Sequence, residues 1–258
     1  MLTYKHVVLI LLVGSVIVIS LAWVLAFLSV WLVLALILLN LAVLFGGSLC
    51  VYSGLYLYAH CKGSDDKKQI TITFDDGPNA DATPGVLDIL KTHNIKAGFF
   101  LIGRNIEKNR EIVKRTLGEG HIVGNHSWSH RKSFGFWSSR KVMDDLRKNE
   151  LLIENICGKK VNLFRPPFGV TNPNIAKVAR LLDYTVIGWS IRSLDTIGGS
   201  NEKTIKRVMR RLKPGGVILL HDNHERIIPI LEELIKKIVA NGYEIVGPEE
   251  LLNIKAYK

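Results

Sequence analysis

The sequence contains few cysteines, no internal repeat and no motif typical of nucleic-acid binding. Its three cysteines, Cys50, Cys61 and Cys157, lack the spacing of a zinc site or a disulfide framework. We therefore interpret all three as free thiols. Charged residues are also absent from a long early stretch, residues 7–58. These absences argue against a cysteine-rich metal domain and a repeat protein, and they predict that nucleic acid is not a partner.

The charge-free stretch is long enough to cross a membrane twice. A signal peptide contains an apolar run of about 7–15 residues, whereas a membrane span needs about 20. The strongest polar residue within residues 7–58 is Asn40. We therefore predict an integral membrane protein with a transmembrane helical hairpin over residues 6–27 and 31–58.

Aromatic residues indicate where this hairpin turns. Trp and Tyr favour the membrane–water interface, where the ring is apolar and its polar group stays hydrated. Trp23 and Trp31 flank a candidate turn near Ala26–Ser29, and Tyr4 and Tyr52–Tyr58 would mark the opposite surface. Both ends of the hairpin would then lie on one side of the membrane.

Lysines leave the orientation of the hairpin open. Lys5 and Lys62 flank the same end of the hairpin, and an excess of lysine usually marks the cytoplasmic face. Large domains nevertheless cross membranes largely regardless of charge. One span followed by an interfacial segment would also place the remaining chain outside.

The part of the chain after the apolar stretch is strongly basic. No acidic residue precedes Asp65, and Lys5 is the one basic residue before Lys62. A basic domain on a membrane suits anionic lipid headgroups or an acidic polymer. We assign residues 1–61 to a membrane anchor and residues 62–258 to one folded domain.

Short apolar segments alternate with amphipathic ones throughout this domain. Gln69–Phe74 alternates and is β-branched, which predicts a strand, and Thr83-Pro84 predicts the start of a helix. Strands alternating with helices imply a parallel sheet with right-handed crossovers. About seven strands predict an α/β fold, a small distorted (β/α) barrel. The other predicted strands are residues 97–102, 121–124, 161–164, 185–188, 217–220 and 243–246, and the helices are residues 83–93, 107–118, 139–156, 174–182, 202–212 and 226–240.

Candidate chemical residues follow three of the predicted strands. Asp75 and Asp76 follow the first strand, His126 and His130 the third, and His221 the sixth. In parallel α/β folds, sites form where strands end. Two imidazoles and one carboxylate leave metal positions open for water and substrate, and a second carboxylate can accept a proton. The alternatives are an ordinary Asp-Gly-Pro turn and two structural histidines.

Four motifs, in this order, resemble those of the polysaccharide deacetylase family. They are residues 73–78 (TFDDGP), 126–130 (HSWSH), 165–169 (RPPFG) and 219–221 (LLH). That family carries the NodB-homology domain of carbohydrate esterase family 4, and the resemblance spans roughly residues 69–247. It implies a metal-dependent hydrolase that removes N-acetyl groups from an amino-sugar polymer, such as peptidoglycan or a chitin-like glycan.

The resemblance also implies roles for individual residues. Asp75 would be the general base that activates water, and Arg165 would orient it. His221 would protonate the departing amine, a role suited to a group that titrates near neutrality. The metal, most often zinc in this family, would be held by Asp76, His126 and His130.

Three further residues would contact the substrate. The backbone N–H of Phe168 would stabilise the tetrahedral oxyanion. Trp189 and Leu219 would line the small apolar pocket that receives the acetyl methyl group. Phe168 replaces the family's more common tyrosine, which matters little because the backbone N–H is the functional group.

One position departs from the family pattern. The family usually places an aspartate three residues after the tryptophan, where it supports the catalytic histidine, and Arg192 stands there instead. A nearby cation would lower the pKa of His221. Asp195 or Asp222 could restore a negative partner, and we predict that Asp195 does so.

Two other functions remain open at this point. The same chemistry could act on a lipid-linked or membrane-proximal amino sugar, which the hairpin and the basic surface favour. Alternatively, the domain could be a catalytically impaired carbohydrate-binding module, which Arg192 favours and the complete set of acids and histidines opposes. The expected partners are accordingly an N-acetylated glycan and the lipid bilayer.

Overall fold

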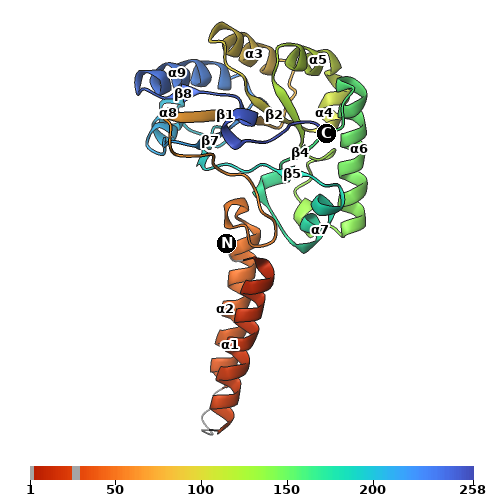
Figure 1. The fold of residues 1–258 in the computed structure, drawn as a ribbon, viewed down its shortest axis with the longest axis vertical. Helices are drawn as coiled ribbons and strands as arrows, with labels where there is room; N and C mark the ends of the chain where they lie inside the picture. Colours follow the sequence, from red (N-terminus) through yellow and green to blue (C-terminus); the bar gives the residue numbers. More distant parts are fainter. Residues whose placement is uncertain (1–2, 25–29) are drawn as a thin grey trace.

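A computed structural model describes residues 3–24 and 30–258. Two long helices, α1 (Tyr4–Val24) and α2 (Val30–Ser48), lie side by side and project from the rest of the protein (Figure 1). Both are long and apolar enough to cross a membrane, by length and composition. The two helices fit the predicted hairpin. Its predicted turn near Ala26–Ser29 lies outside the described residues.

The second helix ends earlier than predicted. α2 stops at Ser48, not at residue 58, and a 3₁₀ turn, η1 (Val51–Ser53), leads to Gly54 in the left-handed conformation, with φ 65°. The apolar side chains that follow are buried against the domain, which removes them from water as a membrane would. These residues are Val51, Leu55, Tyr56, Leu57, Ala59 and Cys61.

Removal of this buried segment is expected to destabilise the domain. We compare a chain that starts at Cys50 with one that starts at Lys62. Each large apolar side chain contributes about 1.5–3 kcal/mol when buried, and the cost of ordering the segment offsets part of the sum. We expect the shorter chain to lose about 2–5 kcal/mol in urea unfolding. Equal midpoints for the two chains would show that residues 50–61 are only a linker.

Eight strands of the described chain form one sheet, in which every pairing between named strands is parallel. The order along the sheet is β5-β4-β3-β2-β1-β7-β6, and β8 pairs with the first residues of β1. The sheet curls into a half-barrel, so the predicted fold class is confirmed. The strands are β1 (Gln69–Asp75), β2 (Gly98–Leu101), β3 (Ile122–Asn125), β4 (Leu163–Phe164), β5 (Thr185–Val186), β6 (Ile191–Arg192), β7 (Gly216–His221) and β8 (Glu244–Ile245).

Helices cover the outer face of this sheet (Figure 1). The main core lies between them and the strands, and in β1 it includes Ile70, Ile72 and Phe74. The alternate residues of β1 point to the inner face, which is closed by Leu251 and Leu252. The remaining helices are α3 (Thr83–Thr92), α4 (Gly103–Lys108), α5 (Arg110–Gly118), α6 (Ser139–Cys157), α7 (Pro173–Leu181), α8 (Asn201–Met209), α9 (Ile227–Ala240) and α10 (Pro248–Leu252).

One local prediction differs from the structure, and two short elements were not predicted. The helix expected over residues 107–118 is two helices, α4 and α5, which meet at Asn109. The Asn109 side chain bonds to the carbonyls of Pro78 and Asn105 there. The short elements β6 and α10 had no clear pattern in the sequence. The three cysteines are free, as predicted.

Candidate active site

The carboxyl ends of the central strands bring the predicted chemical residues to one edge of the sheet. β1 ends at Asp75 and β7 ends at His221, and these two residues are register partners. The chain after β3 supplies His126 and His130, and the residue after β4 is Arg165. Residues that are distant in sequence therefore meet because their strands are parallel neighbours.

A fully buried arginine holds Asp75 in place. Nη1 of Arg165 donates to Asp75 Oδ1 at 2.7 Å and to the Thr73 hydroxyl at 2.9 Å. Nε and Nη2 donate to the backbone carbonyls of Ile187 and Gly188, at 3.1 and 2.8 Å. The buried charge is thus well satisfied, and Oδ2 of Asp75 remains available to the site.

Three side chains beside Asp75 form a candidate metal centre. Ligand atoms of Asp76, His126 and His130 all lie within 4.8 Å of one another. Asp76 Oδ1 lies 3.6 Å from Nε2 of His126 and 3.4 Å from Nε2 of His130. This oxygen is buried and has no hydrogen-bond partner among the described residues. Buried polar atoms are normally paired, so an orphaned carboxylate oxygen beside two imidazoles fits a divalent cation such as zinc.

His126 is held in the form that binds metals. Its Nδ1 donates to the backbone carbonyl of Arg165 at 2.8 Å, which leaves Nε2 facing Asp76. Burial, and then the neighbouring His130, lowers the pKa of His126 to about 3. Burial also lowers the pKa of His130. Both rings are therefore mainly neutral near pH 7, and neutral imidazole is the ligating form.

Two buried asparagines fix the loop that carries both histidines. Asn125 Oδ1 accepts from the Ser127 N–H at 2.9 Å and from Asn149 Nδ2 at 2.9 Å. Asn149 also donates to the Ser127 carbonyl at 3.0 Å, and Ser127 Oγ accepts from the His130 N–H at 2.9 Å. Ser127 and His130 both have positive φ, 66° and 44°. These bonds offset the backbone strain of the tight turn.

His221 is paired with the acid predicted to support it. Asp195 Oδ1 lies 2.8 Å from His221 Nδ1, and Oδ2 accepts from the His221 backbone N–H at 2.8 Å. Burial acts to lower the pKa of His221, but the hydrogen bond and charge of Asp195 outweigh it and raise the pKa to about 9. Burial acts to raise the pKa of Asp195, yet hydrogen bonds with His221 and His224 hold it below its usual range.

The expected effect of Arg192 on His221 is wrong. The pKa of His221 is raised, not lowered. Arg192 is exposed, and its guanidinium lies 5.9 Å from the centre of the Trp189 ring. After β6 the chain turns through Leu194, with φ 60°, and brings Asp195 to the imidazole. The acid is therefore supplied from three residues further along the chain.

Asp222, the other acid considered as a partner, is used elsewhere. Its Oδ2 accepts from the Thr83 hydroxyl at 2.6 Å, and its backbone N–H donates to the Asp75 carbonyl at 3.3 Å. A β-carbon at Gly77 would clash with the Asp222 carboxylate. Burial raises the pKa of Asp222 to about 7. Asp222 thus packs against the turn that presents Asp76, where only glycine fits.

The residues predicted to contact substrate lie around this edge. Phe168 is 44% exposed and has φ 60°, and its ring lies 4.5 Å from the His130 ring. The backbone hydrogen bonds of its turn are donated by the two following residues, so the Phe168 N–H takes no part in them. Trp189 is partly buried, and Leu219 is buried on the inner face of β7.

Several polar residues that position the ligands were missed from the sequence. Asn223 donates to Asp76 Oδ2 at 3.0 Å, and Asn105 donates to the Asp76 carbonyl at 2.8 Å. Both contacts join loops that are distant in sequence, and no pattern predicts them. Asn149 did carry a signal, because it interrupts the apolar stripe of α6, where a polar side chain needs a buried partner.

Comparison with known proteins gives a consistent result. A family model described as polysaccharide deacetylase matches residues 62–187. The peptidoglycan-N-acetylglucosamine deacetylase PgdA of Listeria monocytogenes is 36% identical over 188 residues, which are 73% of this chain but 40% of that protein. A peptidoglycan-N-acetylglucosamine deacetylase of Bacillus cereus is 33% identical over 205 residues, 78% of this chain and 74% of that protein.

A solved structure extends the likeness to three dimensions. The Bc1960 peptidoglycan N-acetylglucosamine deacetylase superposes with a TM-score of 0.73 and 31% identity. The match covers 77% of this chain and 94% of the solved one. The motifs, the curled parallel sheet and these matches agree. The chain belongs to the polysaccharide deacetylase family.

Proposed function

We propose that the protein is a metal-dependent hydrolase that removes N-acetyl groups from a cell-wall amino-sugar polymer of the peptidoglycan class. The observation that carries this proposal is the Asp76–His126–His130 cluster, with Asp75 on one side and His221 at the end of the adjacent strand. A site with three protein ligands leaves room for water and substrate. The two relatives described above are named as peptidoglycan deacetylases, and this supports the proposed class of substrate.

The chain's own residues account for each proton transfer of amide hydrolysis. A divalent cation held by Asp76, His126 and His130, whose ligand types suit zinc, would supply Lewis-acid chemistry at the acetyl carbonyl and make water easier to deprotonate. Asp75 accepts the proton of the attacking water, and Arg165 orients its carboxylate.

The remaining residues act on the carbonyl oxygen and the leaving group. The Phe168 N–H donates to that oxygen as negative charge develops. His221, kept protonated by Asp195, gives its proton to the departing amine. Trp189 and Leu219 enclose the acetyl methyl group. The products are acetate and a free amino sugar.

Asp195→Asn is expected to move the alkaline limb of the kcat/KM profile to lower pH. His221 must be protonated to act as the acid, so activity falls as pH rises through its pKa of about 9. The variant loses the contribution that raises this pKa, while burial, which lowers it, remains. A neighbouring charge typically shifts a pKa by about 1–3 units, and we expect a shift of this size.

The pH–rate profile from acid to alkaline pH measures this shift. Asp183→Asn is the matched control, because Asp183 is exposed and pairs with Lys258, away from the site. An alkaline limb that stays in place in Asp195→Asn would remove His221 or its partner from the mechanism.

One contact favours a substrate near the membrane as a second candidate. The Thr171 N–H donates at 2.9 Å to the carbonyl of Ser48, the last residue of α2, and Thr171 follows Phe168 by three residues. In Figure 1, α7 lies on the side of the domain nearest the hairpin. If α1 and α2 span a membrane, this part of the site lies close to its surface. A lipid-linked amino sugar would be accessible there.

The proposed peptidoglycan substrate requires the domain to face outward. Labelling of a Cys50→Ser/Lys62→Cys variant with a membrane-impermeant thiol reagent in intact cells, beside Cys50→Ser alone, tests this orientation. Labelling from outside agrees with a cell-wall substrate. Labelling only after the cells are opened would favour a lipid-linked substrate on the cytoplasmic side.

Acetate release tests the proposed function itself. The full chain in detergent, loaded with zinc, is incubated with peptidoglycan, N-acetylglucosamine oligomers and a lipid-linked amino sugar. Release from peptidoglycan or the oligomers supports the proposal, and release from the lipid-linked sugar alone supports the second candidate. Saturable binding of glycan without release by folded, zinc-loaded protein would indicate a carbohydrate-binding domain.

A further inference from the structure

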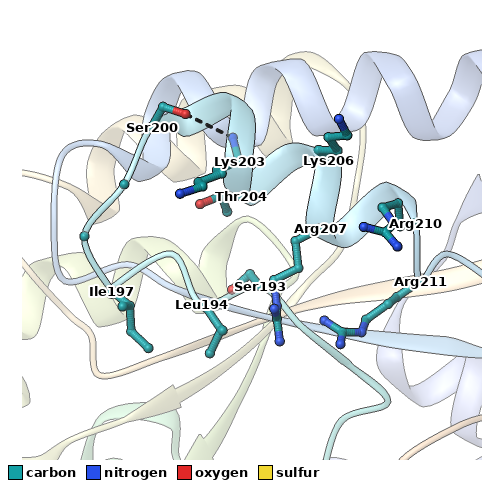
Figure 2. A pocket seen from close by; sticks show the side chains of 12 residues that line it. Ser193, Leu194, Ile197, Ser200, Lys203, Thr204, Lys206, Arg207, Arg210 and Arg211 are labelled. Carbon is teal, nitrogen blue, oxygen red and sulfur yellow. Dashed lines mark hydrogen bonds between the residues drawn. The ribbon is translucent and has the colours of Figure 1, made fainter.

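A basic cavity of about 460 Å³ lies between α8 and the loop that leads into it from β6 (Figure 2). None of the 12 residues that line it is acidic. No lysine or arginine in the lining forms a salt bridge with a described residue. The cationic lining residues are Lys203, Lys206, Arg207, Arg210 and Arg211.

Arginines converge within this cavity. In Figure 2 the head groups of Arg207 and Arg211 approach each other below α8, whereas Lys206 points away. Arg207 Nε donates to the Arg192 carbonyl at 3.0 Å. Burial, followed by the charges of Arg211 and Arg192, lowers the pKa of Arg207, as expected for crowded cations. The Arg192 backbone thus adjoins Arg207, although the Arg192 side chain does not line the cavity.

The cavity adjoins the proposed active site. Ser193 lines the cavity, and its hydroxyl donates at 2.7 Å to Asp195, the partner of His221. The Arg192 guanidinium lies 5.9 Å from the centre of the Trp189 ring. A glycan bound against Trp189 would therefore meet Arg192 on its way to the cavity.

We propose that Arg207 and Arg211 form an anion subsite that binds an acidic substituent, a carboxylate or a phosphate, on the amino-sugar polymer. This inference rests on the proposed deacetylase function. A guanidinium presents paired donors that match the oxygens of either group. A neutral glycan has no partner for these two charges, so the subsite selects acidic polymers.

The test compares three oligomers of equal length on the full zinc-loaded chain. One is neutral N-acetylglucosamine, one alternates with N-acetylmuramic acid and carries carboxylates, and one carries phosphate esters. The variants are Arg211→Gln and Arg207→Gln/Arg211→Gln. The matched control is Lys91→Gln/Arg110→Gln, which removes two exposed cations on α3 and α5. The readouts are kcat/KM and calorimetric Kd for each oligomer.

The subsite predicts a preference that depends on charge. The wild-type ratio of acidic to neutral kcat/KM should fall about tenfold in the double variant, the size of one charged hydrogen bond. Added salt should lower the wild-type ratio. Arg211→Lys should keep a higher ratio of acidic to neutral kcat/KM than Arg211→Gln. The carboxylate and phosphate oligomers show which anion is preferred. The control variant should keep the wild-type ratio.

Two outcomes would overturn the inference. The first is the same ratio of acidic to neutral kcat/KM in the wild type and the double variant. If both release acetate, this outcome contradicts the subsite but not the deacetylase function. The second is an acidic oligomer that binds no more tightly than the neutral one by calorimetry. Calorimetric binding needs no turnover, so it tests the subsite even if the protein is not a deacetylase.

Discussion

Asp75→Asn is expected to lower kcat for acetate release by about 10²–10⁴-fold, the usual contribution of a general base. The amide has nearly the shape of the carboxylate but cannot accept the proton of water. Asp76, His126 and His130 are unchanged, so the zinc content should stay the same. The measurement is acetate release at saturating substrate, with zinc determined on the same sample.

This variant also removes the countercharge of Arg165, which is fully buried. Breaking a buried pair costs about 3–5 kcal/mol, so a lower Tm is expected as well. Thr73→Val is the matched control, because it removes another hydrogen bond of Arg165 and keeps the proton acceptor. The control should lose stability and keep most of its activity. Near wild-type kcat in folded Asp75→Asn would assign the base to another residue.

Removal of the metal is expected to abolish acetate release, and one zinc per chain should restore it. His126→Ala/His130→Ala leaves Asp76 as the remaining ligand of the three, so its zinc affinity should fall by more than about 100-fold, beyond the range for outer-shell changes. The readouts are zinc content by mass spectrometry and the rise in Tm on adding zinc, which reports binding without catalysis.

His93→Ala is the control for the paired histidine variant. His93 is partly buried and pairs with Glu232 at 3.3 Å, on the helical side of the sheet. It should bind zinc as the wild type does. One zinc per chain retained by His126→Ala/His130→Ala would place the metal elsewhere, and full activity after complete chelation would exclude a metal-dependent reaction.

The sequence predicts the fold because local pattern and topology agree. Alternation in Gln69–Phe74 and the proline after Thr83 mark β1 and α3 within one or two residues. Parallel pairing follows from the strand–helix order, and it brings Asp75 and His221 together. Most of the candidate site follows from the predicted strand positions, from their parallel pairing and from the four motifs.

The wrong predictions concern features that tertiary contacts determine, such as where a helix ends and where a side chain points. The apolar character of residues 51–61 suits lipid and a protein core equally well, so the end of α2 at Ser48 could not be predicted from hydropathy. β6 is two residues long, and its position depends on its pairing with β7. The direction of the Arg192 side chain depends on that same pairing. Its expected effect on His221 was therefore wrong, although the predicted partner, Asp195, is the acid beside the imidazole.

The contacts that join distant loops could not be inferred from local sequence. Thr171 meets Ser48 and Asn223 meets Asp76 across long separations in sequence. The cavity between α8 and β6 likewise depends on how the chain turns at Leu194. In each case the residue type was visible in the sequence, but its partner was not.

The most direct test of the proposed function is a zinc titration of the metal-free full chain, with acetate and new free amines counted on the same peptidoglycan sample. The structure predicts equal amounts of the two products, rising until one zinc is bound per chain. Acetate without matching amines would indicate ester cleavage, and neither product from folded, zinc-loaded protein would contradict the deacetylase assignment.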